Sequence, residues 1–288
     1  MPLNRALIGK IYSPLSSPVT SEAVQQYARA CNDDNPSYFR SPLAGGTIAP
    51  PMFNAVITWL ALITAISDPE LRVDLLRLLH RGQEMRFFEP VRPGDLISAR
   101  ARIISIEDSA AGETLAIGLD AANQRNQLVS QTSFAALIRG RRQRENGPTS
   151  NSAGRKSPAD KPLVTTARTI ALDQTVRYAN ASGDRNPIHL DDSVARMAGL
   201  PGIIVHGLCT MAFASEVIVE HVCSRDPSRL RRLAAQFSHP VFPGDTITTT
   251  VWPGNNSGAA SQFSYETRNA AGVVVLRDGI AEIGPPGL

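Results

Sequence analysis

The sequence contains few cysteines and few aromatic residues. Only three of its 288 residues are cysteine, at positions 31, 209 and 223, and 6% are aromatic. Three irregularly spaced cysteines exclude a disulfide framework or a zinc site of paired cysteines, and they fit a reducing compartment. The chain is long enough for two domains, and 42% of it is apolar. This composition excludes wholesale disorder and indicates a globular protein with a sizeable core.

The sequence also has little net charge and no long apolar run. No stretch approaches the ~18 uninterrupted apolar residues of a membrane span, and the first residues hold no apolar run of signal-peptide length. We therefore expect a cytoplasmic protein without a membrane segment. The formal charge is +3, yet residues 139–161 hold seven basic and two acidic side chains. No aromatic residue lies among them for base stacking, so the stretch indicates a solvated linker and no nucleic-acid partner.

A repeated pattern divides the chain into two halves. Tyr-Ala-x-Ala followed by Asp-x-Asn-Pro occurs at 27–36 and recurs 151 residues later, at 178–187. Phe followed by Pro-Val-x-Pro-Gly-Asp occurs at 87–95 and recurs 150 residues later, at 237–245. Two matches in the same order indicate an internal duplication. The predicted organisation is an N-terminal half at 1–140, a linker at 141–162 and a C-terminal half at 163–288.

Both halves have the same predicted order of elements. A short amphipathic helix ends near Asp-x-Asn-Pro, and an apolar helix follows, at 52–66 in the first half and 208–222 in the second. The first of these apolar helices has almost no polar side, so we expect it to be buried nearly all round. The predicted strands follow Pro-Gly-Asp, at 96–105, 114–122, 128–139, 246–252, 262–268 and 272–283. Each half is therefore predicted to be α+β, with a buried helix wrapped by an antiparallel sheet.

The second half carries a longer motif around its Asp-x-Asn-Pro sequence. Residues 182–189 read Ser-Gly-Asp-Arg-Asn-Pro-Ile-His, and residues 204–210 read Ile-Val-His-Gly-Leu-Cys-Thr. Together these segments resemble the signature of the MaoC-like, (R)-specific enoyl-CoA hydratases, also called hydratase 2. The duplicated layout resembles the double hot-dog members of that family. The resemblance implies a double hot-dog fold with a catalytic C-terminal half and a noncatalytic, dehydratase-like N-terminal half.

Asp184 and His189 are the candidate proton-handling pair. Hydration of a 2-enoyl thioester needs a base for water, an acid for the α-carbon and a hydrogen-bond donor for the thioester oxygen. Histidine can work from either protonation state near neutral pH. The donor is expected to be a backbone N–H at the start of the buried helix. The resemblance implies that Asp184 and His189 hold the water and that Gly207 supplies this N–H.

Three further residues are candidates for substrate binding. We expect Asn186 and Ser182 to orient the water or the pair, although Asn-Pro after a helix is equally a turn signal. We expect His206 to fix the loop beside Gly207. Neither a metal nor another cofactor is predicted, because the spacing of Asp184, His189 and Asp191 does not indicate a metal site and the reaction needs none.

The first half provides an internal comparison for these candidates. Tyr38 stands where the second half has His189, and a phenol with a pKa of about 10 cannot replace imidazole as a base near pH 7. Pro50-Pro51 stands where the second half has His206-Gly207, and proline has no N–H to donate. We therefore expect the N-terminal half to shape the acyl pocket and not to form a second active site.

The predicted function is reversible hydration of trans-2-enoyl thioesters. The resemblance implies the (R)-3-hydroxyacyl product, and the substrate's carrier is coenzyme A or acyl carrier protein. Two alternatives stay open: a hot-dog thioesterase, which would hydrolyse the thioester, and a noncatalytic acyl-binding scaffold. Retention of both Asp184 and His189 argues against the scaffold. We expect the two halves to pair as a pseudo-dimer within one chain, and a homodimer of whole chains stays open.

Overall fold

The computed structural model describes residues 2–40, 46–140, 161–257 and 260–285, so residues 141–160 of the predicted linker lie outside the described part. The first half contains β1 (Leu15–Pro18), α1 (Ser21–Ala30), α2 (Asn54–Ile66), β2 (Leu78–Phe87), β3 (Leu96–Ser109), β4 (Gly112–Ala122) and β5 (Leu128–Arg139). The second contains β6 (Val164–Thr169), α3 (Gln174–Ser182), α4 (Asp192–Met197), α5 (Gly207–His221), β7 (Leu230–Phe237), β8 (Thr246–Ser257), β9 (Ala260–Asn269) and β10 (Val274–Ile283). None of the helices in these ranges is long and apolar enough to cross a membrane.

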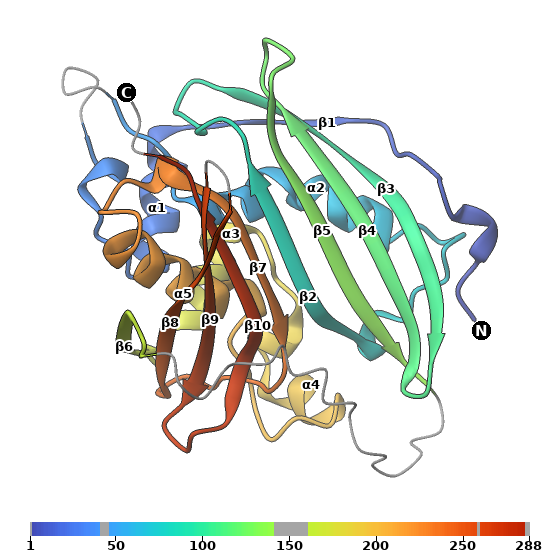
Figure 1. Cartoon of the computed structure of the whole chain (residues 1–288). Helices are drawn as coiled ribbons and strands as arrows, with labels where there is room; N and C mark the ends of the chain where they lie inside the picture. Colours follow the sequence, from blue (N-terminus) through green and yellow to red (C-terminus); the bar gives the residue numbers. More distant parts are fainter. Residues whose placement is uncertain (1, 41–45, 141–160, 258–259, 286–288) are drawn as a thin grey trace.

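The strands of both halves form one antiparallel sheet in the order β1-β3-β4-β5-β2-β7-β10-β9-β8-β6. At its centre β2 pairs with β7, with Gly82 opposite Gln236 and Arg86 opposite Arg232. Figure 1 shows α2 and α5 behind this sheet, one in each half. The architecture confirms the prediction of two α+β halves, each a central helix wrapped by an antiparallel sheet, joined into one continuous sheet.

The inward-facing side chains of the strands bury the central helices. Leu115, Ile117 and Leu119 alternate along β4 with half-buried residues and are at most 2% exposed. This period of two residues places every second side chain on the helix side of the sheet. The apolar area removed from water here is the main stabilising contribution to the fold.

The two central helices differ in how well they are covered. Most side chains of α5 are buried. On α2, by contrast, Leu60 is 48% exposed, and Val56, Trp59 and Ile63 are half-buried. The prediction that this first apolar helix is buried nearly all round is therefore wrong. The sheet covers one side of α2 only, and an apolar sequence alone does not guarantee that the other side is covered as well.

Four strands were not predicted from the sequence: the central strands β2 and β7 and the edge strands β1 and β6. The central strands carry charged side chains on the outer face of the sheet. There Arg232 contacts Glu84 at 2.9 Å and Glu282 at 2.8 Å. Such ion pairs between neighbouring strands replace the apolar runs by which the other strands are identified in the sequence.

The Pro-Gly-Asp motifs are turns, as predicted. Gly94 and Gly244 have φ angles of +92° and +91°, which residues other than glycine rarely adopt. The carboxylate of Asp95 accepts a hydrogen bond from the Arg92 N–H at 2.8 Å, and that of Asp245 does the same for Phe242. Each motif therefore directs the chain into the following strand.

Candidate active site

The loop that follows α3 is held by a series of short-range hydrogen bonds. The helix ends at Gly183, whose φ of +82° turns the chain. The Ser182 hydroxyl accepts a hydrogen bond from the Asp184 N–H at 3.2 Å, and the Asp184 carboxylate accepts one from the Asn186 N–H at 3.1 Å. The Asn186 side chain in turn caps a short 3₁₀ helix, Pro187–His189, by accepting from the Ile188 N–H at 3.3 Å. The loop thus turns His189 back toward Asp184.

The His189 imidazole is fixed by the second segment of the motif. Its Nδ1 lies 2.8 Å from the carbonyl oxygen of Ile204. A carbonyl can only accept, so in the neutral ring Nδ1 carries the hydrogen and Nε2 is left as a proton acceptor. Side-chain oxygen or nitrogen atoms of Asp184, His189 and His206 lie within 4.8 Å of one another. The structure therefore brings the predicted pair together.

Burial acts in opposite directions on the two members of this pair. It raises the pKa of the Asp184 carboxyl above its ordinary value and lowers the pKa of the His189 imidazole below its own. The attraction between carboxylate and imidazolium opposes both shifts. Because desolvation is the larger effect, the pKa of Asp184 lies above its ordinary value and that of His189 below its own.

Gly207 is the first residue of α5, directly after His206. The N–H groups of a first helical turn have no partner within the helix, and the helix dipole favours negative charge there. A Cβ added to Gly207 would lie 3.1 Å from the Cε1 atom of Phe237. The absence of a side chain therefore leaves room for the Phe237 ring beside this backbone N–H.

The set Asp184, His189 and His206 is the one group of three metal-type side chains found within the described residues. The rings of His189 and His206 are stacked, with centroids 3.8 Å apart and planes at 28°. A metal ion binds imidazole nitrogen in the plane of the ring, and two stacked rings cannot both direct a nitrogen to one ion in this way. In addition, Nε2 of His206 already lies 3.0 Å from the Asp184 carbonyl oxygen. The residues therefore fit a metal poorly.

The predicted substrate-binding residues have different surroundings. Ser182 is 5% exposed and His206 is 1% exposed, and both contact the backbone of Asp184. Both side chains are thus within hydrogen-bond distance of the loop that carries Asp184. The Asn186 side chain is half-buried, and within the described part of the chain its amide NH₂ has no hydrogen-bond partner.

The first half shows the corresponding asparagine in a loop that has Tyr38 in place of His189. Asn35 caps its own 3₁₀ helix by accepting from the Ser37 N–H at 2.9 Å. Its NH₂ group donates to the carbonyl oxygen of Arg225 at 3.0 Å. The cap alone is turn chemistry and occurs in both halves. The NH₂ of Asn186 differs in being available to a bound molecule.

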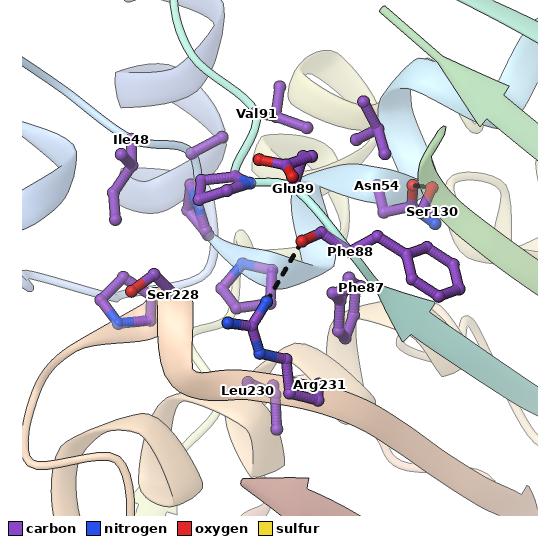
Figure 2. Close-up of a pocket in the computed structure, with 16 residues that line it drawn as sticks. Ile48, Asn54, Phe87, Phe88, Glu89, Val91, Ser130, Ser228, Leu230 and Arg231 are labelled. Carbon is purple, nitrogen blue, oxygen red and sulfur yellow. Dashed lines mark hydrogen bonds between the residues drawn. The ribbon is translucent and has the colours of Figure 1, made fainter. Parts of the chain in front are cut away.

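The N-terminal counterpart of the helix start at Gly207 borders a small cavity. Pro50 and Pro51 line a small cavity together with Phe87, the counterpart of Phe237. Figure 2 shows Arg231 extending from β7 across this cavity to the carbonyl oxygen of Phe88, at 3.1 Å. The cavity measures about 40 Å³, which has room for a few water molecules but not for an acyl thioester.

Trp59 is a residue of the site that the sequence analysis did not single out. A Cβ added to Gly183 would lie 3.3 Å from the Cδ1 atom of Trp59. The N-terminal half thus places an aromatic side chain beside the loop that carries Asp184. No signal in the sequence could have indicated this contact, because it joins α2 to a loop more than a hundred residues away.

Comparison with known proteins assigns the family. The MaoC like domain matches residues 154–274, and the FAS1-like, dehydratase domain region matches residues 6–132. The chain is 30% identical over 212 residues to 3-hydroxyacyl-thioester dehydratase Y of Mycobacterium tuberculosis, an alignment that spans 71% of this chain and 72% of that protein. The chain belongs to the MaoC-like dehydratase family.

Other MaoC-like relatives agree with this assignment. The chain is 28% identical over 247 residues to the probable enoyl-CoA hydratase 2 of Dictyostelium discoideum, covering 82% of this chain and 80% of that one. It is 26% identical over 212 residues to the peroxisomal enoyl-CoA hydratase 2 of Arabidopsis thaliana, covering 70% and 68%.

Solved structures confirm the fold. A MaoC-like dehydratase from Phytophthora capsici has a TM-score of 0.82 at 20% identity, over 99% of this chain and 98% of that one. A Mycobacterium tuberculosis protein described as a double hotdog fold has a TM-score of 0.66 at 12% identity, over 96% of each chain. The double hot-dog fold predicted from the sequence is therefore confirmed.

Proposed function

We propose that the protein catalyses reversible hydration of trans-2-enoyl-CoA to (R)-3-hydroxyacyl-CoA, with Asp184 and His189 as the proton-transfer pair. The observation that carries this proposal is the buried pair itself, in which burial shifts the two pKa values in opposite directions. Pairs of titratable groups with divergent environments are typical of acid–base catalysis. The names of the hydratase 2 relatives support the reaction and its handedness.

In the proposed reaction each proton has a defined origin. Nε2 of the neutral His189 removes a proton from water as the water oxygen bonds to C3 of the enoyl group. The C2=C3 π electrons move onto C2 and the thioester, and C2 then takes the proton of the Asp184 carboxyl. A proton returns from the His189 imidazolium to the Asp184 carboxylate. One water molecule is added, and the pair regains its starting state.

Two neighbouring groups support this reaction in the proposal. The Gly207 N–H at the start of α5 donates to the thioester oxygen, where negative charge accumulates during the addition. The NH₂ of Asn186 holds the water or the substrate next to the pair. Because water and acyl group are each held on one side, one enantiomer is formed.

The carrier and the compartment belong to the same proposal. The names of the relatives favour coenzyme A over acyl carrier protein. A cytoplasmic location stays a prediction, since three relatives are named as peroxisomal. A homodimer of whole chains also stays a prediction.

The deciding experiment is a hydration assay with crotonyl-CoA. Two signals are monitored in it: the loss of enone absorbance and the release of free thiol. We expect the wild type to consume the enone without releasing thiol and to form one enantiomer of the 3-hydroxy product. Asp184→Asn and His189→Gln should each lower kcat/KM by about 10²-fold or more, because each removes one of two proton-transfer steps. Thiol release without enone loss would identify a thioesterase.

The first half supplies the matched control. Asp33→Asn and Tyr38→Phe change the equivalent positions of the noncatalytic half. We expect both variants to keep kcat/KM within about threefold of wild type, because neither side chain reaches the substrate. Equal losses in the two halves would count against an active site at Asp184 and His189.

A further inference from the structure

The side chain of His206 joins parts of the site that lie far apart in the sequence. It stands at the N-cap of α5, immediately before Gly207, and is 1% exposed. Its Nε2 lies 3.0 Å from the carbonyl oxygen of Asp184. One face of its ring is stacked on the His189 imidazole, with centroids 3.8 Å apart. One side chain therefore contacts both members of the proton-transfer pair.

The protonation state of His206 follows from its surroundings. Burial, with the neighbouring His189, lowers its pKa to about 3, so the ring is neutral at physiological pH. Since a carbonyl oxygen only accepts, the single ring hydrogen lies on Nε2 and is donated to Asp184. Nδ1 is then an acceptor, and this buried nitrogen has no hydrogen-bond partner among the described residues. The Nε2–H of His206 is thus engaged by the Asp184 backbone.

The loop does not need His206 in order to fold. In the first half, Asp33 accepts from the Asn35 N–H at 3.2 Å and Asn35 accepts from the Ser37 N–H at 2.9 Å. These are the same turns that Asp184 and Asn186 make in the second half. The residue that corresponds to His206 is Pro50, which has neither a ring N–H nor an aromatic face.

We propose that His206 is a positioning residue, which holds the Asp184 peptide through its Nε2–H and sets the plane of the His189 ring by stacking. This inference rests on the proposed hydratase activity. A buried nitrogen without a partner costs free energy. A phenylalanine would fill the same space without that cost, so packing alone does not explain a histidine here. The hydrogen bond to Asp184 does.

Two contacts fix His189 in this arrangement. The hydrogen bond from its Nδ1 to the Ile204 carbonyl limits rotation of the ring about the Cβ–Cγ bond, and the stacked face of His206 limits tilting of the ring plane. The ring of Tyr178 lies behind His206, with centroids 4.9 Å apart. The His189 ring, with Nε2 as its free acceptor, is therefore held in one orientation near Asp184.

The experiment separates the stack from the hydrogen bond with three variants assayed on crotonyl-CoA. His206→Phe keeps an aromatic face and loses the donor, His206→Gln keeps a donor and loses the face, and His206→Ala loses both. We expect kcat to fall about tenfold in the Phe and Gln variants and about 10²-fold in the Ala variant, with KM within twofold of wild type. Equal kcat in His206→Ala and wild type would overturn the inference.

The pH profile provides a readout that a purely structural role would not move. The groups that face the two rings are Asp184 on the loop and Tyr178 on α3, and burial holds the pKa of Tyr178 well above its ordinary value. Behind them lie Cys31 and Cys209. Loss of the His206 ring exposes His189 to water, so its pKa rises and the acid limb of kcat/KM moves to higher pH in His206→Ala. In His206→Phe the limb stays in place.

A measurement on the unaltered protein keeps the test independent of folding. Nitrogen-15 NMR of the wild-type imidazoles at pH 7 should show His206 neutral with its hydrogen on Nε2, and His189 with its hydrogen on Nδ1. A charged His206, or a hydrogen on its Nδ1, would refute the inference even if every variant is unstable. A wild type without hydration activity would instead refute the proposed function and leave these tautomers unchanged.

Discussion

A histidine and a tyrosine at equivalent positions separate the two halves chemically. Both halves keep the aspartate and the Asx turns that follow it, and both bury the residue at the end of the 3₁₀ helix. In the second half that residue is His189, whose imidazole can exchange a proton with Asp184. In the first half it is Tyr38, which lies beside Asp33 and is fully buried. The first half therefore keeps a buried carboxyl whose neighbour is a phenol and not an imidazole.

The buried carboxyl of Asp33 predicts a stability change with pH. Burial raises the pKa of Asp33 from 3.8 to about 7. Between these values the folded state holds a proton that the unfolded state has released, so the free energy of unfolding falls as pH rises from 4 to 7. A pKa difference of about three units corresponds to a change in the free energy of unfolding on the order of 4 kcal/mol at most.

Asp33→Asn should remove this pH dependence. We expect the variant to match wild type within about 1 kcal/mol at pH 4.5 and to be more stable by a few kcal/mol at pH 8, as measured by urea unfolding. Asp34→Asn, at the exposed neighbouring position, is the matched control and should show no such divergence. If the free energy of unfolding changed with pH in the same way in Asp33→Asn and in wild type, burial of the ionised Asp33 carboxylate would not destabilise the folded state, and the prediction would be wrong.

At the scale of elements, the start of α5 holds the Gly207 N–H, which is the proposed hydrogen-bond donor to the thioester oxygen. His206 has a ψ of 135°, a value that the residue before a proline readily adopts. Proline is also well tolerated at the first position of a helix. Gly207→Pro therefore removes the N–H at a place where the backbone can accept proline. Gly207→Ala keeps the N–H, but its Cβ would press on the Phe237 ring at 3.1 Å.

The contact with Phe237 determines how this prediction is tested. In a Phe237→Leu background, which makes room beside position 207, we compare Gly207→Pro with Gly207→Ala. The Pro variant should lower kcat/KM by about 10²-fold relative to the Ala variant, the usual effect of losing one oxyanion donor. Circular dichroism checks that both are folded. Equal turnover of the two would remove the Gly207 N–H from the mechanism.

The sequence was informative about elements and motifs where the pattern is local. The apolar helix at 208–222 and the strand at 128–139 agree with α5 and β5 to within about one residue. The spacing of Asp184 and His189 likewise lies within one loop. The stack of His206 on His189 and the approach of Trp59 to Gly183 join distant segments, so no local pattern contains them. The uncovered side of α2 was missed for the same reason.

At the scale of the whole molecule, two sets of contacts between the halves, here called seams, hold them together. In the sheet, β2 pairs with β7. On the helix side, the Tyr27 and Tyr178 rings of α1 and α3 lie 5.8 Å apart between centroids. Gln174 is fully buried there, and its side chain donates to the Ala30 carbonyl of the other half. Buried polar links of this kind are costly to break, because the released carbonyl is left without a donor.

These seams predict that the two halves stay associated when the chain connecting them is cut. A specific protease site placed within residues 141–160 leaves every described contact intact. After cleavage we expect both fragments to elute together in gel filtration and to keep the enone-hydrating activity of the full chain. Gln174→Ala should lower the urea concentration at which the fragments separate, since it removes the link to Ala30. Arg185→Ala, on the exposed loop of the same half, is the control. Separate elution of the fragments in native buffer would show that the linker, and not the seam, holds the pseudo-dimer together.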